Sequence, residues 1–190
     1  VRSRRQRQMC IRDRVKPYTP LEVAGRDIYI REGCYNCHSQ MIRPMVSEVL
    51  RYGEASQATE FIYDHPFQWG SKRTGPDLAR IGGKYPDSWH YFHMLDPRKL
   101  TPGSIMPEYS WLYSKKTDYG VLPKKLSVLT AVGVPYTDTE IENSANAARA
   151  QAEKITAAMS DAGVEMKMKD KQIIALIAYL QRLGTDLGAK

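Results

Sequence analysis

The stretch Cys34-Tyr35-Asn36-Cys37-His38 carries the most information in this chain of 190 residues. Two cysteines separated by two residues and followed directly by a histidine form the C-x-x-C-H string that attaches a c-type haem. A separation of three positions, about one helical turn, places both sulfurs on one side, where they reach the two vinyl groups on one edge of a porphyrin. The adjacent imidazole then lies under the iron as an axial ligand. The string therefore predicts one covalent haem c, attached through Cys34 and Cys37 and ligated by His38.

Two other uses of paired cysteines are less favoured. A structural zinc site normally needs four ligands, often two C-x-x-C pairs, and the chain has only one further cysteine, Cys10. A redox dithiol of the thioredoxin kind needs a βαβ context, whereas the residues before Cys34 have a helical pattern. A metal site and a dithiol therefore stand as minor alternatives to haem attachment.

The net charge of +7 is concentrated at the N-terminus. Residues 1–14 contain six of the 28 basic residues and one of the 21 acidic residues, so the rest of the chain carries a net charge of +2. The global charge therefore does not indicate nucleic acid as a partner. Residues 1–14 lack apolar periodicity and resemble a translated sequencing adapter, so we expect a non-native or disordered basic tail. We expect residues 15–190 to form one haem domain.

Two helices are predicted in the first half of the chain. The capping box at residues 19–22, with proline at the first helical position, predicts a helix that runs to about Glu32 and ends at Gly33. A second helix is expected over residues 87–95, and the segment between them, 39–74, is expected to be irregular. No convincing β-alternation occurs, so the predicted fold class is all-α.

The C-terminal third predicts two more helices. A second capping box at residues 137–140 begins an amphipathic helix expected to continue to Gly163. The last helix, with Asp170 as its cap, is expected to end at Gly184. The apolar residues of the amphipathic helix recur at alternating spacings of four and three, namely Ile141, Ala145, Ala148, Ala152, Ile155 and Met159.

The sequence also indicates where in the cell the protein is located. Its longest uncharged stretches, residues 126–137 and 172–181, are shorter than the roughly 18–20 residues that cross a bilayer. Because bacterial haem lyases act on the outer side of the plasma membrane, the haem string itself implies export.

An electron-transfer haem needs a sixth ligand, and methionine is the usual one where the potential is high. Met41 and Met45 follow the string so closely that they would have to double back over the ring. Met94 lies on an expected helix, where packing is its simpler role. Met106 lies in an extended loop and is followed by Pro107, so that it can lie against the open face of the haem. We expect Met106 as the second metal ligand.

Histidine is the other candidate for the sixth position. His65, His90 and His93 could each give a bis-histidine haem of lower potential. A lone histidine in an aromatic segment is more often a hydrogen-bonded packing residue. The predicted metal ligands are therefore His38 and Met106.

The order of these features resembles that of class I cytochromes c: a helix, the haem string, Gly-Pro-Asp-Leu at residues 75–78, a Ser-x-Met-Pro loop and a terminal helix. In that family the first and last helices cross beside the haem. The resemblance implies that Gly25 and Tyr29 meet the face around Ile177 and Leu180. It also implies that Pro76 lies along the haem edge near the proximal histidine.

Three segments, 25–45, 63–85 and 105–109, are similar to a narrower family, the mono-haem subunit (subunit II) of cbb3-type cytochrome c oxidases. The resemblance implies a class I cytochrome c fold with long insertions, about 39–74 and 110–165, and an extra amphipathic helix. It implies a non-catalytic electron-transfer subunit. Electrons would pass from a di-haem cytochrome c subunit, or a donor cytochrome, to the catalytic haem–copper subunit that reduces oxygen.

The same resemblance implies the periplasmic face of the bacterial inner membrane, with an N-terminal anchor that is expected to be missing here. Residues 39–74, with Arg43, Lys72 and Arg73, are a candidate contact with the large subunit. They could instead merely cover the haem edge, with Arg73 or Arg80 pairing a propionate.

Two other functions are less favoured by the sequence. A free periplasmic cytochrome c, or the cytochrome domain of a dehydrogenase, would not need the roughly 36-residue insertion before residues 75–76. A haem gas sensor or peroxidase would have an open sixth position, against which Met106 argues.

Overall fold

The computed structural model describes residues 13–70 and 72–187, and within them no strand occurs. An isolated antiparallel bridge joins Lys116 to Lys171. The expected all-α class is confirmed. Residues 1–12, most of the expected basic tail, lie outside the described residues.

The α-helices are α2 (Pro20–Arg31), α3 (Val46–Tyr52), α4 (Asp87–Leu95), α5 (Pro97–Leu100), α6 (Leu122–Ala131), α7 (Asp138–Glu142), α8 (Ser144–Ala158) and α9 (Gln172–Arg182). The 3₁₀ turns are η1 (Cys34–Asn36), η2 (Ala58–Phe61), η3 (Ser110–Tyr113), η4 (Ser160–Ala162), η5 (Met166–Met168) and η6 (Thr185–Leu187).

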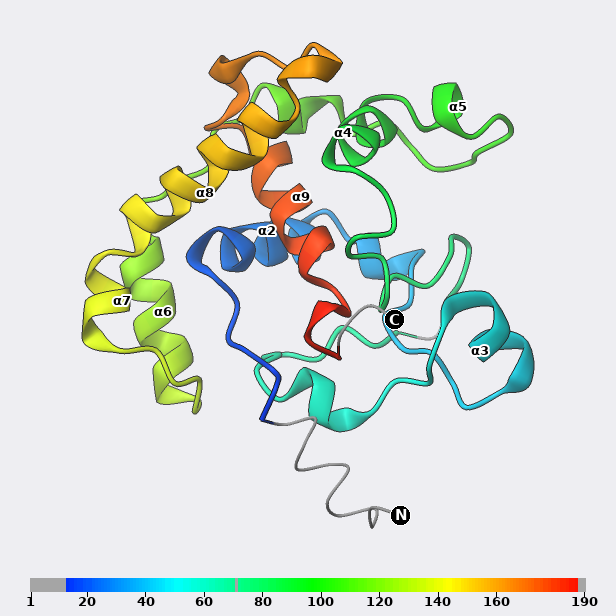
Figure 1. The fold of residues 1–190 in the computed structure, drawn as a ribbon, viewed down its shortest axis with the longest axis horizontal. Helices are drawn as coiled ribbons and strands as arrows, with labels where there is room; N and C mark the ends of the chain where they lie inside the picture. The colour runs from blue at the N-terminus through cyan, green and yellow to red at the C-terminus, as the bar shows by residue number, and fades with distance from the viewer. Residues whose placement is uncertain (1–12, 71, 188–190) are drawn as a thin grey trace.

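The crossing of α2 and α9 forms the centre of the core (Figure 1). The helices meet closely at Gly25, where a side-chain carbon would overlap the carbonyl oxygen of Ala175 and lie 2.8 Å from Cβ of Tyr179. The rings of Tyr29 and Tyr179 pack with centroids 5.3 Å apart. A residue without a side chain is therefore what allows the two helices to approach.

The register of this crossing differs from the expected one. The resemblance suggested Ile177 and Leu180 as the facing residues, but the atoms nearest Gly25 belong to Ala175 and Tyr179. Every residue of α9 from Ile173 to Leu180 is buried, because α9 packs against α2, α4 and α8 together. An apolar pattern that covers the whole helix does not identify which side meets α2.

The ends of α2 follow the capping signals. The Thr19 hydroxyl accepts from the amide of Glu22, and the Glu22 carboxylate accepts from the amide of Thr19 at 2.8 Å. The helix is followed by Gly33 in the left-handed region, at φ 71°. The expected cap of the last helix is wrong: α9 begins after Lys171 with no side-chain cap. Asp170 instead offers its backbone carbonyl to the amide of Thr117.

The expected amphipathic helix over residues 137–163 is divided into α7 and α8. The division lies at Asn143, after which the buried Ser144 hydroxyl donates to the carbonyl of Ile141. Such local hydrogen bonds compete with a continuous helix. The predicted apolar face is nevertheless confirmed, since α8 lies against α2 and α9 with Ala148, Ala152 and Met159 buried.

The segment 39–74, expected to be irregular, contains α3 and the turn η2. In Figure 1, α3 lies at the opposite edge of the molecule from α6 and α7. Among the helices that the structure describes, none is long and apolar enough to cross a membrane.

Candidate haem-binding site

The C-x-x-C-H string forms one tight turn directly after α2. The amides of Cys37 and His38 both donate to the carbonyl of Cys34, at 3.1 and 3.0 Å. Both thiols are free, that of Cys34 half-buried and that of Cys37 exposed. Burial, with a further contribution from Glu32, raises the pKa of the Cys34 thiol to about 12. The turn therefore presents two thiols and an imidazole within five residues.

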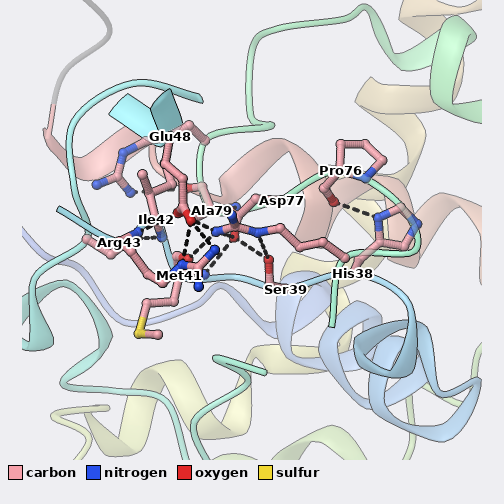
Figure 2. Close-up of polar contacts among 12 residues, drawn as sticks. His38, Ser39, Met41, Ile42, Arg43, Glu48, Pro76, Asp77 and Ala79 are labelled. Atoms are coloured by element: carbon pink, nitrogen blue, oxygen red, sulfur yellow. Dashed lines mark hydrogen bonds and ion pairs between the residues drawn. The ribbon is translucent and has the colours of Figure 1, made fainter. Parts of the chain in front are cut away.

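The His38 imidazole is held by one hydrogen bond (Figure 2). Its Nδ1 donates to the backbone carbonyl of Pro76 over 2.7 Å. Burial lowers the pKa of this histidine, so the ring is neutral at pH 7. With the proton on Nδ1, the lone pair of Nε2 is free to bind a metal, and the hydrogen bond fixes the tautomer and the ring orientation.

Gly75 lies directly against this ring. A side-chain carbon at this position would lie 2.7 Å from Nδ1 of His38 and closer still to Cε1. The amide of Gly75 donates to the carbonyl of Cys37 at 2.9 Å, which joins the Gly-Pro-Asp-Leu segment to the haem string. The segment thus needs glycine for space and the following proline for its carbonyl oxygen.

Gly75→Ala should therefore displace the imidazole of His38. Because the ring would have to rotate away from the carbonyl of Pro76, we expect covalent haem to be retained while electron-transfer activity falls on the order of tenfold or more. Electron paramagnetic resonance of the oxidised protein would measure the loss of low-spin iron. Thr74→Ala, at the exposed neighbouring position, is the matched control and should leave the signal unchanged.

These groups have the chemistry that a c-type haem requires. Two free thiols stand one turn apart, and the histidine that follows offers Nε2. Among residues 13–70 and 72–187, no three or more His, Cys, Asp or Glu side chains form a group that could hold a metal ion.

The loop that carries Met106 returns to the haem string. Met106 is partly buried against the core, and its amide donates to the Ser104 hydroxyl at 3.2 Å. The amide of Tyr109 donates to the carbonyl of Met94 at 2.9 Å, which ties the loop to α4. Burial, together with the nearby Cys34 and Cys37 sulfurs, raises the pKa of Tyr109 to about 12. The end of the loop is therefore within electrostatic reach of the two thiols.

The other candidate ligands are distributed differently. Met94 is buried in the core and Met45 is exposed, while Met41 is half-buried. His65 is exposed. The structure thus gives Met94 the packing role expected of it.

The histidines of α4 belong to an aromatic stack that the sequence did not reveal. Tyr85 stacks on Trp89 with centroids 4.1 Å apart, and Trp89 stacks on His93 at 4.4 Å. Among the described residues, Nε2 of His90 and Nδ1 of His93 are buried without a hydrogen-bond partner. The four-residue spacing of positions 85, 89 and 93, the last two of them on α4, is the signal that could have indicated the stack.

Asp77 joins the two backbone segments that meet at His38 (Figure 2). Its carboxylate accepts from the Ser39 hydroxyl at 2.6 Å, from the amide of Met41 at 2.9 Å and from the amide of Ala79 at 2.8 Å. It is also paired with the guanidinium of Arg73 at 3.4 Å. The residues after His38 and those after Pro76 are therefore held together by one buried acid, which sequence reasoning missed.

Two arginines that were candidates for pairing a propionate are bound to protein carboxylates. Arg73 lies 2.7 Å from the Glu48 carboxylate and donates to the Ser39 hydroxyl at 2.8 Å. Arg80 lies 2.6 Å from the carboxylate of Glu60. These partners weaken the reading in which either arginine neutralises a propionate.

The Glu48 carboxylate should make the free energy of unfolding depend on pH in the acidic range. Hydrogen bonds from Arg73, and then from Arg43, lower its pKa to about 2. A pKa below the unfolded value of about 4.3 adds stability above that value, and this stability is lost as the pH falls toward 2. Glu48→Gln should therefore flatten the fall in unfolding free energy between about pH 4.3 and pH 2. Denaturant titrations at each pH would measure this, and an unchanged slope would contradict it.

The comparisons with known proteins identify a family for this chain. A family model described as "Cytochrome C oxidase, mono-heme subunit/FixO" matches residues 5–187. The comparison with individual curated proteins gives no match. Proteins of the family are haem-containing electron-transfer subunits of a membrane-associated oxidase. The chain therefore belongs to the FixO family, the mono-haem subunits of cbb3-type cytochrome c oxidases, as the resemblance of its sequence predicted.

Proposed function

We propose that this chain carries one covalent haem c, attached through Cys34 and Cys37 and ligated by His38 and Met106. The observation that carries the proposal is the 2.7 Å bond from Nδ1 of His38 to the carbonyl of Pro76, next to two free thiols. Because this hydrogen bond engages Nδ1, the other ring nitrogen of His38, Nε2, is free to bind the iron, and His38 directly follows Cys37 in the chain.

Each residue then has a defined task. The haem would supply the one-electron redox chemistry, and the protein sets its ligands and exposure. Cys34 and Cys37 would hold the porphyrin, and His38 would offer its Nε2 lone pair to the iron. Pro76 orients that imidazole through its carbonyl oxygen and would lie along the edge of the haem. Met106 would offer a neutral thioether as the second ligand, which would favour ferrous over ferric iron.

The proposed path of the electron follows from the family. We place the domain, residues 15–190, on the periplasmic face of the inner membrane, with 39–74 and 110–165 as insertions in a class I cytochrome c. It receives electrons from the di-haem cytochrome c subunit or a donor cytochrome, and it passes them to the catalytic haem–copper subunit. The family match favours this reading over a free cytochrome c or the cytochrome domain of a dehydrogenase.

The test is attachment of haem in cells that have a haem-maturation system. The full chain should give a pyridine haemochrome spectrum of the c type, and haem should remain on the denatured polypeptide. The double variant Cys34→Ala and Cys37→Ala should carry no covalent haem. Cys10→Ala removes the third cysteine and is the control that should keep it. Covalent haem on the double variant would overturn the proposal.

A further inference from the structure

The ring nitrogen Nδ1 of His93 is shielded from water and has no hydrogen-bond partner among the described residues. A polar atom in this state has lost its hydrogen bonds to water without gaining others, which is unfavourable. Because buried polar atoms in folded proteins are almost always hydrogen-bonded, such an atom indicates a partner supplied by a bound group. The role of this nitrogen therefore depends on what lies around it.

Aromatic stacking holds the His93 ring in one orientation. Tyr85, Trp89 and His93 stand at four-residue intervals, and successive rings are nearly parallel, at 15° and 14°. Gln181 of α9 donates its side-chain amide to the carbonyl of Tyr85 at 2.9 Å and to the carboxylate of Asp87 at 2.6 Å. These bonds anchor the start of α4. Protein contacts thus position the ring, so that little entropy is lost when Nδ1 forms a hydrogen bond.

Two observations relate His93 to the proposed axial ligands. The first concerns His38, because burial, and then the charge of His38, lower the pKa of His93. The second concerns the loop that carries Met106. The amide of Tyr109, at the end of this loop, donates at 2.9 Å to the carbonyl of Met94, the residue next to His93, and Met106 packs against the apolar cluster that contains Met94. His93 therefore lies where α4 meets the Met106 loop, within electrostatic reach of the haem string.

A haem site offers two kinds of acceptor, the sulfur of an axial methionine and the propionate carboxylates. Because the pKa of His93 is lowered, the ring is neutral at pH 7 and carries one N–H. A carboxylate is matched best by a cationic donor. A thioether sulfur is a weak, uncharged acceptor, for which a neutral N–H is sufficient. The chemistry of the ring therefore favours the sulfur.

We propose that Nδ1–H of His93 donates a hydrogen bond to the sulfur of Met106 and thereby raises the reduction potential of the site. The proposal rests on the proposed function, in which Met106 is an axial ligand. The hydrogen bond draws electron density from the sulfur, which then donates less to ferric iron. His93 is a positioning residue, because it acts through Met106 and is not itself a ligand.

The experiment measures, by absorption, the ratio of ferrous to ferric protein in the haem-loaded full chain, at a fixed potential near the midpoint of the unmutated chain. His93→Phe keeps a ring to stack on Trp89 but removes Nδ1, and we expect the ratio to fall about fivefold, the effect of one hydrogen bond. His93→Asn carries an amide N–H near the position of Nδ1 and should restore part of the ratio. The matched control is His90→Phe, which removes the other unpartnered ring nitrogen of α4 and should leave the ratio unchanged. An unchanged ratio in His93→Phe, or an equal fall in both phenylalanine variants, would overturn the proposal.

A double variant identifies the acceptor. In Met106→Ala, poised near its own midpoint, the addition of His93→Phe should change the ratio no further, because both residues act through one hydrogen bond. If the full fall persists without the sulfur, the acceptor is another group, such as a propionate, and the proposal fails.

The absorption band of the thioether–iron bond separates this proposal from the proposed function. If the unmutated oxidised chain lacks the band, Met106 is not a ligand and the proposed ligand set fails. If the band is present while His93→Phe leaves the ratio unchanged, only the hydrogen bond from His93 is refuted.

Discussion

Met106→Ala should leave the haem covalently attached and remove its sixth ligand. The oxidised protein should lose the long-wavelength absorption band that a thioether–iron bond produces. Because a neutral sulfur stabilises ferrous iron, the reduction potential should fall on the order of 0.1 V or more, within the range of about 0.8 V over which axial ligands act. Reduction of this haem by its electron donor should become less favourable as a result. Spectroscopic redox titration of the full chain measures both the absorption band and the reduction potential.

The control for this variant is another methionine. Met45→Ala removes an exposed thioether that follows the same haem string and should change neither the band nor the potential. The prediction is contradicted if Met106→Ala keeps the band. Rapid binding of carbon monoxide by the unmutated reduced protein would also contradict it and would favour a gas sensor.

Gly25→Ala should destabilise the fold strongly, although alanine is the better helix former. Helix propensity alone predicts a gain of up to about 1 kcal/mol for this change in the interior of α2. At Gly25, however, the added carbon would overlap the carbonyl oxygen of Ala175 and lie 2.8 Å from Cβ of Tyr179. Backbone does not yield as a flexible side chain does, so α2 and α9 would have to separate. We expect a net loss of about 3 kcal/mol.

Chemical denaturation of the full chain measures this loss. The control is Gly120→Ala, where the nearest atom to an added carbon is a carboxylate oxygen of Asp118 at 3.3 Å. That exposed position should change the free energy of unfolding by no more than about 0.5 kcal/mol. A stabilised Gly25→Ala variant would show that the helices do not meet at this residue.

Features that depend on neighbouring residues could be predicted from the sequence. The capping box at Thr19 and the glycine at position 33 set the two ends of α2. The haem string consists of only five consecutive residues, so its proposed function can be read from the sequence without a fold. The Asp87–Leu95 helix was predicted with its observed bounds.

Features that depend on distant residues could not be predicted from the sequence. Asp77 acts through contacts with Ser39 and Met41, more than thirty positions away. The helix α3 was missed because its apolar residues face outward and its buried Glu48 is stabilised by arginines, so periodicity gave no core-facing side. The all-round burial of α9 likewise hid which of its sides meets Gly25.

The most direct test of the account is the intact mass of the mature chain, purified under denaturing conditions from cells that mature c-type cytochromes. The account predicts the mass of the polypeptide plus one haem, with digestion placing the addition on the peptide that contains Cys34 and Cys37. A mass equal to that of the polypeptide alone, or an addition on any other peptide, would contradict it.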